Sequence, residues 1–414
     1  MNKPDQALNK DFFSLWQGQL VSQIGTHLFN VARIYYLTEV LKSGILVGSL
    51  LACCVFATLL ISPFAGVIVD RSSRRQILIK SDIFSGIVSI ILATVAFSAK
   101  NNNAIAGVLF ISSISISVSN SFFNSAAFAF IPKIVPENQL RKANSLFSAS
   151  SQVAQIFGQG LGGLLYGLLG APVLFFMNGV SFLISGLLEF FIKKDAPPIN
   201  SNSNSKKSTK KELGFALKYM FYEPGLKECL LFLTCLNFAF VPLFVIIPFF
   251  TQKILNGGAQ TYGYFIGALS SGTLLGMLAV AKISGHKKSL PLFTYFTLAL
   301  LPLSYFMLYL ALHFLQLIGA FLILGFCNST LSTLATTAIQ KNTADLHRGK
   351  IGALMSTISN IFGPAAFLLS GITVDASGSQ LQSVFVILGG FLTLITFILI
   401  AQSRVFINAM AGYK

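Results

Sequence analysis

Charged residues are scarce in this sequence, making up 10% of its 414 residues where soluble domains carry about 25%. Only 13 residues are acidic, against 29 basic ones, and tryptophan occurs once. Hydrophobic residues reach 54% and include 40 phenylalanines, and the polar residues are too few to cover them in water. The composition therefore excludes a cytosolic enzyme, a secreted disulfide scaffold and a disordered chain. It indicates a membrane protein.

Motifs of metal binding, redox chemistry and nucleotide hydrolysis are also missing. The sequence has no C-x-x-C, H-E-x-x-H, G-x-x-x-x-G-K-[ST] or serine nucleophile elbow. Its five cysteines all lie in apolar runs, where they serve best as small packing residues: Cys53, Cys54, Cys229, Cys235 and Cys327. We expect no metal, no cofactor and no enzymatic activity. The polar N-terminus does not resemble a removable signal peptide.

Long apolar runs dominate what is present. Because a membrane span needs about 20 mostly apolar residues, the sequence predicts twelve transmembrane helices. Lipid leaves only helices or closed barrels, and runs of this length without alternating polarity favour helices. We therefore expect an all-α membrane protein. The predicted spans are 14–41, 44–69, 77–99, 104–130, 143–169, 172–192, 229–252, 260–283, 289–311, 314–338, 350–373 and 380–403.

The basic residues lie almost entirely on one side of these spans. If both termini are cytoplasmic, all but four of the 29 fall in cytoplasmic segments. The exceptions are Lys42, Lys100 and Lys253 outside, and Arg33 within a span. The positive-inside rule therefore predicts cytoplasmic termini, and it explains the net charge of +16 without a nucleic-acid partner. The best-fitting location is a bacterial inner membrane.

A polar stretch divides the chain into two similar halves. The segment KKDAPPINSNSNSKKSTKKE at 193–212 is rich in Pro, Asn, Ser and Lys, which is typical of a flexible tether. The loop sequence at 131–146 also aligns without gaps to that at 339–354, as parallel repeats of six spans would. We predict a bundle at 1–192, a cytoplasmic linker with an interfacial helix at 193–228 and a second bundle at 229–414.

The sharpest local motif is GVIVDRSSRR, from Gly66 to Arg75, between the second and third predicted spans. Gly66 would permit close helix approach, Asp70 would cap a neighbouring helix, and the arginines would find carboxylate partners. This motif resembles the signature loop of the major facilitator superfamily, whose fold has two pseudo-symmetric six-helix bundles. The resemblance implies a cytoplasmic conformational gate made of Gly66, Asp70, Arg71, Arg74, Arg75, Asp82, Glu137 and Arg141.

Within that superfamily the sequence is similar to the branch of macrolide and enterobactin exporters. The segments that carry this similarity are WQGQLVSQIG (16–25), DRSSRRQILIKSD (70–82), PKIVPENQLRKANSL (132–146) and HRGKIGALMS (347–356). The resemblance implies export of a siderophore or an amphipathic drug, with two lobes that alternate in access. The second-half loop AKISGHKKSL lacks the expected aspartate, so a weaker latch is predicted there.

The first predicted span carries a stripe of polar side chains. Gln19, Gln23, His27, Asn30 and Arg33 fall on one arc about 120° wide on a helix. Polar atoms facing lipid would be costly, so this arc must face protein or a watery cavity. We interpret it as part of a substrate and proton path. The alternative is a seam of hydrogen bonds to other helices that only holds the bundle together.

Further polar residues complete the predicted pathway. They are Asn124, Gln155, Glu189, Asn237 and Asn328, although a packing hydrogen bond is a common role for a single asparagine. No acidic residue lies at a clear midplane position. His27 is therefore the first candidate proton carrier, because histidine titrates near neutral pH, and Glu189 is the second.

Together these patterns predict a monomeric secondary transporter whose partners are a small molecule, protons and membrane lipid. Three alternatives stay open on the sequence alone. One is import of a nutrient or metabolite, since direction is not written in these residues, and another is flipping of a lysolipid. A receptor without transport activity is disfavoured by the short loops.

Overall fold

The chain folds entirely into helices in the part that the structure describes. The structure is a computed structural model, and it describes residues 9–99, 101–193, 226–283, 289–311, 313–341, 343, 351, 355 and 357–402. No strand occurs within these residues, which confirms the predicted all-α class. Most of the predicted linker at 193–228 and most of the second repeat segment at 339–354 lie outside them.

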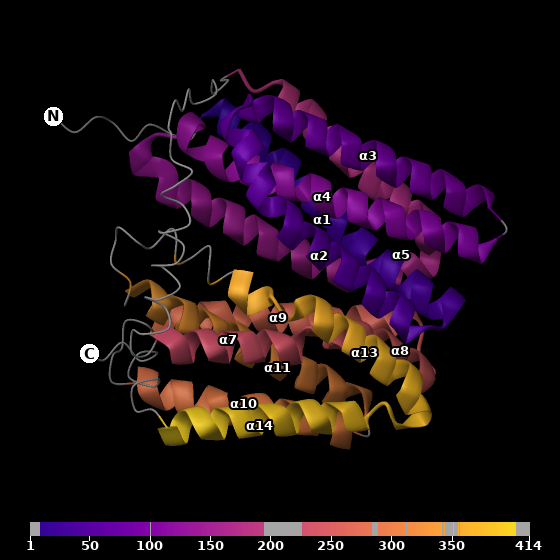
Figure 1. Ribbon diagram of the computed structural model, residues 1–414, viewed down its shortest axis with the longest axis vertical. Coiled ribbons are helices and arrows are strands. Elements are labelled where there is room, and N and C mark those ends of the chain that lie inside the picture. Colours follow the sequence, from indigo (N-terminus) through magenta and orange to yellow (C-terminus); the bar gives the residue numbers. More distant parts are fainter. Residues whose placement is uncertain are drawn as a thin grey trace. The chain divides into compact units, whose positions relative to one another are not determined.

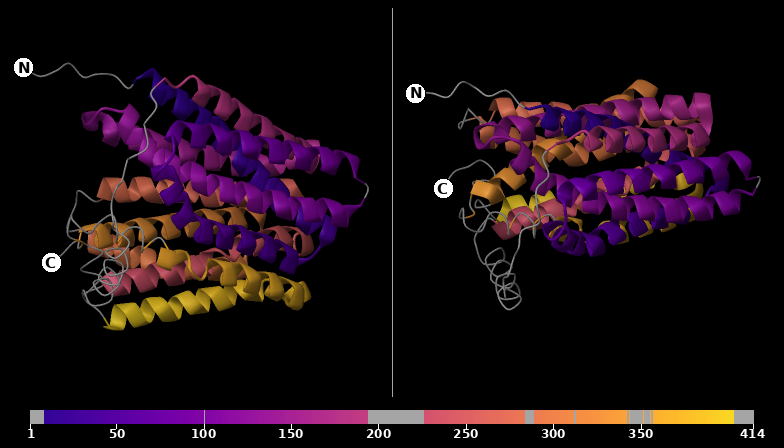
Figure 2. Two further views of the ribbon diagram at one scale, coloured as in Figure 1. Left: turned by 45° about the horizontal axis from the view of Figure 1, so that its top comes forward. Right: turned by 90° about the horizontal axis from the view of Figure 1, so that it is seen from above.

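The described chain separates into two compact units (Figure 1). The first unit holds residues up to the linker together with Gly257–Gly263, and the second holds the remainder. Helices of the first unit are α1 (Lys10–Tyr36), α2 (Gly44–Asp70), α3 (Arg74–Ser98), α4 (Asn102–Ile134) and α5 (Leu140–Phe190), with a π-helical turn, η1 (Leu37–Leu41), after α1. In both views of Figure 2 these helices run side by side along their lengths.

The second unit is built from shorter helical pieces. They are α7 (Leu226–Phe240), α8 (Leu243–Lys253), α9 (Ala259–Ile283, whose first residues belong to the first unit), α10 (Leu290–Leu310), α11 (Phe314–Lys341), α13 (Gly363–Ser377) and α14 (Ser383–Gln402). Two single 3₁₀ turns, at Glu137–Gln139 and Gly378–Gln380, precede α5 and α14.

The helices agree with the twelve predicted spans once three details are understood. Among the described residues, nine helical stretches are long and apolar enough to cross a membrane, with α7 and α8 counted together as Leu226–Lys253 and α13 extended to Thr357–Ser377. Helix α5 contains two predicted spans, because Gly170 breaks it with a left-handed φ of 76° just before Pro172. Helix α1 falls short in apolar content because of its polar stripe, and α14 has only a short apolar stretch.

Local sequence explains where several helices begin. The side chains of Asn9, Ser43, Ser73 and Asn101 each accept a hydrogen bond from a backbone N–H in the first turn of α1, α2, α3 and α4. These N–H groups have no partner inside the helix, so such caps stabilise helix starts. The cap residues coincide closely with the polar gaps between the predicted spans.

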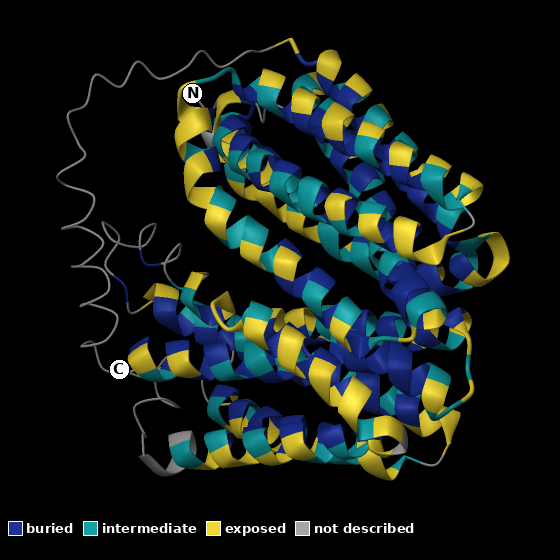
Figure 3. Cartoon of the chain, turned by 45° about the vertical axis from the view of Figure 1, so that its right-hand side comes forward, coloured by how far each residue is buried: buried dark blue, intermediate teal, exposed yellow. Residues whose placement is uncertain are grey.

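The outward faces of the helices are apolar. Large hydrophobic side chains stand out from the bundles, including Phe128 at 84% exposure and Leu315 at 78%. Figure 3 shows the same division on the ribbons, with exposed and buried residues on opposite sides of individual helices. In water such a surface would be unfavourable, whereas in lipid it is the expected one. The chain is therefore a multi-pass membrane protein.

Helix α1 is held closely by both parts of α5. Before the break, a Cβ placed on Gly158 would lie 2.5 Å from the Cβ of His27, and one on Gly162 would lie 2.9 Å from Val31. After the break, a Cβ placed on Gly18 of α1 would lie 2.9 Å from the Oγ of Ser185. Small residues allow this backbone approach, which fixes the rotation of α1 and hence the direction of its polar stripe.

Candidate functional site

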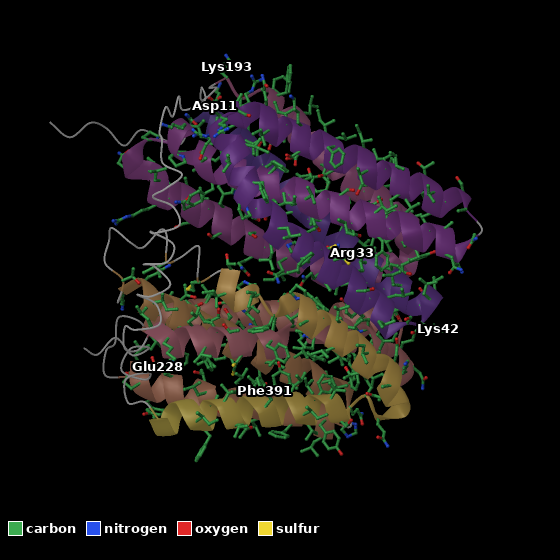
Figure 4. All side chains as sticks on the ribbon, viewed as in Figure 1. Asp11, Arg33, Lys42, Lys193, Glu228 and Phe391 are labelled. Atoms are coloured by element: carbon green, nitrogen blue, oxygen red, sulfur yellow. The ribbon has the colours of Figure 1, made fainter. Side chains whose placement is uncertain are left out.

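The polar stripe of α1 lies in the first unit. It is buried at its Gln19 end and partly exposed along the rest of the helix. Gln19 is buried at 8% exposure, while Gln23, His27, Asn30 and Arg33 are all partly exposed. Each residue follows the previous one by three or four positions, which is about one helical turn, so the five side chains form a continuous line along α1. In Figure 4 the labelled Arg33 lies near the end of this line that is farther from the labelled Asp11.

The hydrogen bonds of the stripe stay almost entirely inside α1. Gln23 donates to the Gln19 side chain at 3.3 Å, and Gln19 donates to Ser22 at 3.5 Å. Among the described residues, the side chains of His27 and Asn30 make no hydrogen bond, and His27 Nδ1 is buried without a partner. Among the described residues, the only side-chain hydrogen bond from the stripe to another helix is that of Arg33 to Cys54 of α2. The polar groups of the stripe remain available to a ligand or to water.

Arg33 carries a positive charge inside a membrane helix without a carboxylate partner among the described residues. Its Nη1 donates to the Cys54 sulfur of α2 at 3.6 Å, and its guanidinium lies 5.6 Å from the ring centre of Phe29. Its Nε is buried with no hydrogen-bond partner. The one acidic residue nearby in sequence, Glu39, is exposed and accepts a hydrogen bond from Tyr166 at 2.8 Å. The charge of Arg33 is therefore free to attract an anionic group.

The other predicted pathway residues occupy different settings. Asn124 of α4 is exposed, Gln155 of α5 is partly exposed and Glu189 is fully buried. In the second unit, Asn237 donates to the Ser359 carbonyl at 3.2 Å, which is the packing role expected for many single asparagines. Asn328 keeps a buried Oδ1 without a partner in the described chain, so it retains capacity to bind.

The predicted gate residues divide into exposed and buried ones. Asp70, Arg71 and Arg141 are exposed, whereas Arg74 and Asp82 are buried at 3% and 2% exposure. The Glu137 side chain lies outside the described part. A Cβ on Gly66 would meet nothing within 4 Å among the described residues, so the close helix approach predicted there is not found. The reason is that Gly66 lies on a partly exposed side of α2.

Arg75 is a gate residue whose hydrogen bond joins two helices. Its Nη2 donates to the Phe190 carbonyl at 2.5 Å, and its guanidinium lies 5.6 Å from the Phe190 ring centre. The carbonyl belongs to the last turn of α5, where backbone acceptors lack helical partners. Arg75 therefore ties the start of α3 to the end of α5 within the first unit.

Sequence reasoning missed a buried polar cluster between α3 and the second part of α5. The sequence assigned Asp82 to the gate and Glu189 to the pathway, yet the two lie near each other, with Ser185 beside Asp82. A signal was present, because Ser181, Ser185 and Glu189 recur every fourth residue, as do Ser81, Ser85 and Ser89. Such spacing places polar groups on one helix face inside an otherwise apolar span.

Comparison with known proteins places these features in a family. The sequence profile of the Major Facilitator Superfamily matches residues 15–366, so the chain belongs to this superfamily of transporters. Macrolide efflux protein A of Streptococcus pyogenes is 25% identical over 380 residues, which cover 89% of this chain and 90% of that protein. A candidate bacilysin exporter, BacE of Bacillus subtilis, is 26% identical over 360 residues, covering 81% and 82% of the two chains.

Solved structures agree on the fold. The nucleoside transporter NupG superposes with a TM-score of 0.74 at 14% identity, covering 95% of this chain and 99% of its own. A bacterial homologue of the iron transporter ferroportin gives 0.73 at 14% identity, covering 96% and 99%. At this identity the likeness concerns the fold alone.

Proposed function

We propose that the chain is a secondary active transporter that exports a small amphipathic molecule in exchange for protons. Transport proceeds by alternating access, in which the substrate site opens to one side of the membrane at a time. The observation that carries this proposal is the polar line of α1, which keeps buried polar atoms without partners in the described chain and ends at Arg33, whose charge has no carboxylate partner there. Buried polar groups without partners are unfavourable unless a ligand or water occupies them.

The direction and the substrate class are supported by the relatives. Both relatives named above are called efflux or export proteins, and one of them is matched over nine tenths of its length. Arg33 suits a substrate with a carboxylate, catecholate or similar anionic group, and the nearby aromatic Phe29 suits an apolar body. A siderophore or a macrolide-like drug combines an apolar body with polar groups. The location proposed is a bacterial inner membrane, with both termini cytoplasmic and the transporter active as a monomer.

The proton role is assigned first to His27. Its ring sits in the middle of the polar line, with Nδ1 buried and without a hydrogen-bond partner in the described chain. A histidine in such a place changes its charge when it gains a proton, and this change alters the attraction that Arg33 exerts on an anionic substrate. Glu189 is the second candidate, and its surroundings are considered below.

The decisive experiment compares small molecules in cells and medium by mass spectrometry, with and without the protein, under iron-limited and iron-replete growth. We expect one or more compounds to accumulate in cells that lack the protein and to disappear from their medium. Arg33→Ala should reproduce this loss, while Lys80→Ala, which removes an exposed charge from the same unit, should not.

The outcomes separate the substrate classes. Accumulation of an iron chelator only under iron limitation selects a siderophore. If the chelator profile is unchanged and cells that lack the protein retain added erythromycin, the substrate is a macrolide-like drug. Higher compound levels inside cells that contain the protein would mean uptake, and would refute export.

A further inference from the structure

Two acidic side chains share a buried space inside the first unit, where α3 packs against the second part of α5. Asp82 is 2% exposed and Glu189 is fully buried. A Cβ on Gly186 would lie 3.5 Å from the Asp82 Cβ, and Glu189 follows Gly186 by about one helical turn. Asp82 is also the ionisable group whose charge acts on Glu189. The two carboxyl groups are therefore neighbours.

Neither carboxyl group has a cation to neutralise it in the described chain. Both oxygens of Glu189 and Oδ2 of Asp82 are buried without a hydrogen-bond partner there. Arg74 precedes Asp82 by two turns, about 12 Å along the helix axis, and its own Nε and Nη1 are unpartnered. Two ionised carboxylates in such surroundings would repel each other and would have lost their hydration, which is strongly unfavourable.

Two hydroxyl groups in the same space are also unsatisfied. Ser185 is fully buried and lies beside the Asp82 carboxyl, and Ser85 is 1% exposed and about one turn after Asp82. The Oγ atoms of both serines lack a hydrogen-bond partner among the described residues. A hydroxyl donates to a carboxylate and accepts from a carboxylic acid, so these groups accommodate either protonation state.

The charged groups nearest to this space are Arg75, whose Nη2 donates to the Phe190 carbonyl next to Glu189, and Asp11, whose carboxylate accepts from the Lys193 N–H about one turn further along. The charged and titratable groups of the neighbouring helices are, on α3, Arg74, Arg75 and the exposed Lys80; on α4, Lys133; on α5, Arg141 and Lys142; and on α1, Lys10, Asp11, His27 and Arg33. The side of α1 that meets Ser185 presents Gly18, which has no charge. Neither Arg75 nor Asp11 bonds to the Glu189 oxygens or to Asp82 Oδ2 in the described chain.

We propose that Asp82 and Glu189 together form a proton-binding site, separate from the polar line of α1. A bound proton is shared in a hydrogen bond between the two carboxyl groups, with the Ser185 and Ser85 hydroxyls as further partners. Binding forms one O–H bond on a carboxylate, and release passes that proton to water and leaves the pair with one more negative charge. The proposal rests on the proposed function and deepens it, because it names a second proton site beside the candidate His27.

Helix packing connects this site to α1. Ser185 lies between the Asp82 carboxyl on one side and Gly18 on the other. A Cβ placed on Gly18 would be 2.9 Å from the Ser185 Oγ. When the pair loses its proton, repulsion between the carboxylates and a changed hydrogen bond of Ser185 act directly on this contact. Gly18 immediately precedes Gln19, the first residue of the polar line. Protonation at the pair thus alters the position of the helix that holds Arg33.

Infrared spectroscopy of the purified full-length protein in detergent tests the site without any substrate. At neutral pH the wild type should show the C=O stretching band of a protonated carboxylic acid shielded from water, and alkaline pH should remove it. Asp82→Asn and Glu189→Gln should each abolish or strongly reduce the band. Glu39→Gln removes an exposed carboxyl of the same unit and should leave it unchanged.

Ser185→Ala gives a second readout if a carboxyl variant fails to fold. It should shift the frequency of the band, because the acid loses a hydrogen-bond partner, whereas a merely structural serine would leave the frequency unchanged. The absence of the band in the folded wild type, or its persistence in both carboxyl variants, would overturn the proposal. Removal of the band by sodium at constant pH would also overturn it, since the bound cation would then be sodium.

The test is independent of export. If the band behaves as expected while no compound is exported, the proton site stands and the proposed function fails. If export is found while the band is absent, the reverse holds.

Discussion

The contact between Gly158 of α5 and His27 of α1 gives the most quantitative prediction. A Cβ at Gly158 would lie 2.5 Å from the His27 Cβ and 3.0 Å from the Ile24 carbonyl oxygen. Non-bonded carbons rest at about 3.5–4.0 Å, so Gly158→Ala requires the two helices to separate locally by about 1 Å. The Ile24 oxygen belongs to the backbone and cannot rotate away, and α1 is also held on its other side at Gly18.

Overpacking of this kind typically costs about 1–3 kcal/mol, and the rigid neighbours here favour the upper end. The replacement also gains up to about 1 kcal/mol, because alanine is the better helix former. We therefore expect Gly158→Ala to lower the free energy of unfolding by about 2 kcal/mol. The assay is an unfolding titration of the purified protein in mixed micelles with a denaturing detergent.

Gly107 of α4 is the matched control. A Cβ there meets no heavy atom within 4 Å among the described residues, so Gly107→Ala should gain only the helix-propensity term and leave the protein equally or more stable. If the two variants differ by less than about 0.5 kcal/mol, α1 and α5 do not approach as closely as the structure indicates, and the reasoning is refuted.

Three further perturbations test other contacts. Arg75→Ala removes the hydrogen bond to the Phe190 carbonyl and the ring contact, and should lower the free energy of unfolding by about 1–2 kcal/mol in the same titration. Tyr305→Phe removes a fully buried bond of 3.0 Å to the Ala239 carbonyl and should cost about 1–2 kcal/mol. His27→Ala should abolish proton-driven efflux from energised cells without lowering the amount of protein in the membrane.

Each of these variants has a matched control variant that should behave differently. Arg71→Ala and Tyr309→Phe alter exposed side chains of the same types and should change stability by no more than about 0.5 kcal/mol. Equal losses in Arg75→Ala and Arg71→Ala would mean that charge, rather than the α5 contact, matters. His313→Ala lies at an exposed position and should leave efflux intact, and full efflux by His27→Ala would exclude His27 as the coupling group.

The sequence predicted the helices and their limits well, for local reasons. A run of apolar residues as long as the membrane is thick has no stable conformation in lipid other than a helix or a barrel strand. The polar gaps between runs contain the capping residues, such as Ser73, that satisfy the first turn of the next helix. Even the break at Gly170 is visible in the sequence as a glycine shortly before Pro172.

The polar line of α1 was also predictable, because helical periodicity alone puts Gln19 to Arg33 on one face. Periodicity left open whether that face bonds to other helices or keeps its polar groups available. In the described chain the bonds of Gln19 and Gln23 remain within α1, His27 Nδ1 has none, and Arg33 bonds to the Cys54 sulfur of α2. The transport roles assigned to these residues stay predictions.

What the sequence determined by itself was the membrane environment, the helical class and the face on which each polar residue lies, because these follow from composition and from the helix repeat. Which faces meet was decided only by the tertiary structure. Gly66 has the expected motif but no close neighbour in the described chain, while Asp82 and Glu189, assigned to different roles, lie together. Pairing of this kind depends on small residues such as Gly186 and Gly18 on separate helices, and the rules of local sequence do not say which helices will pack together.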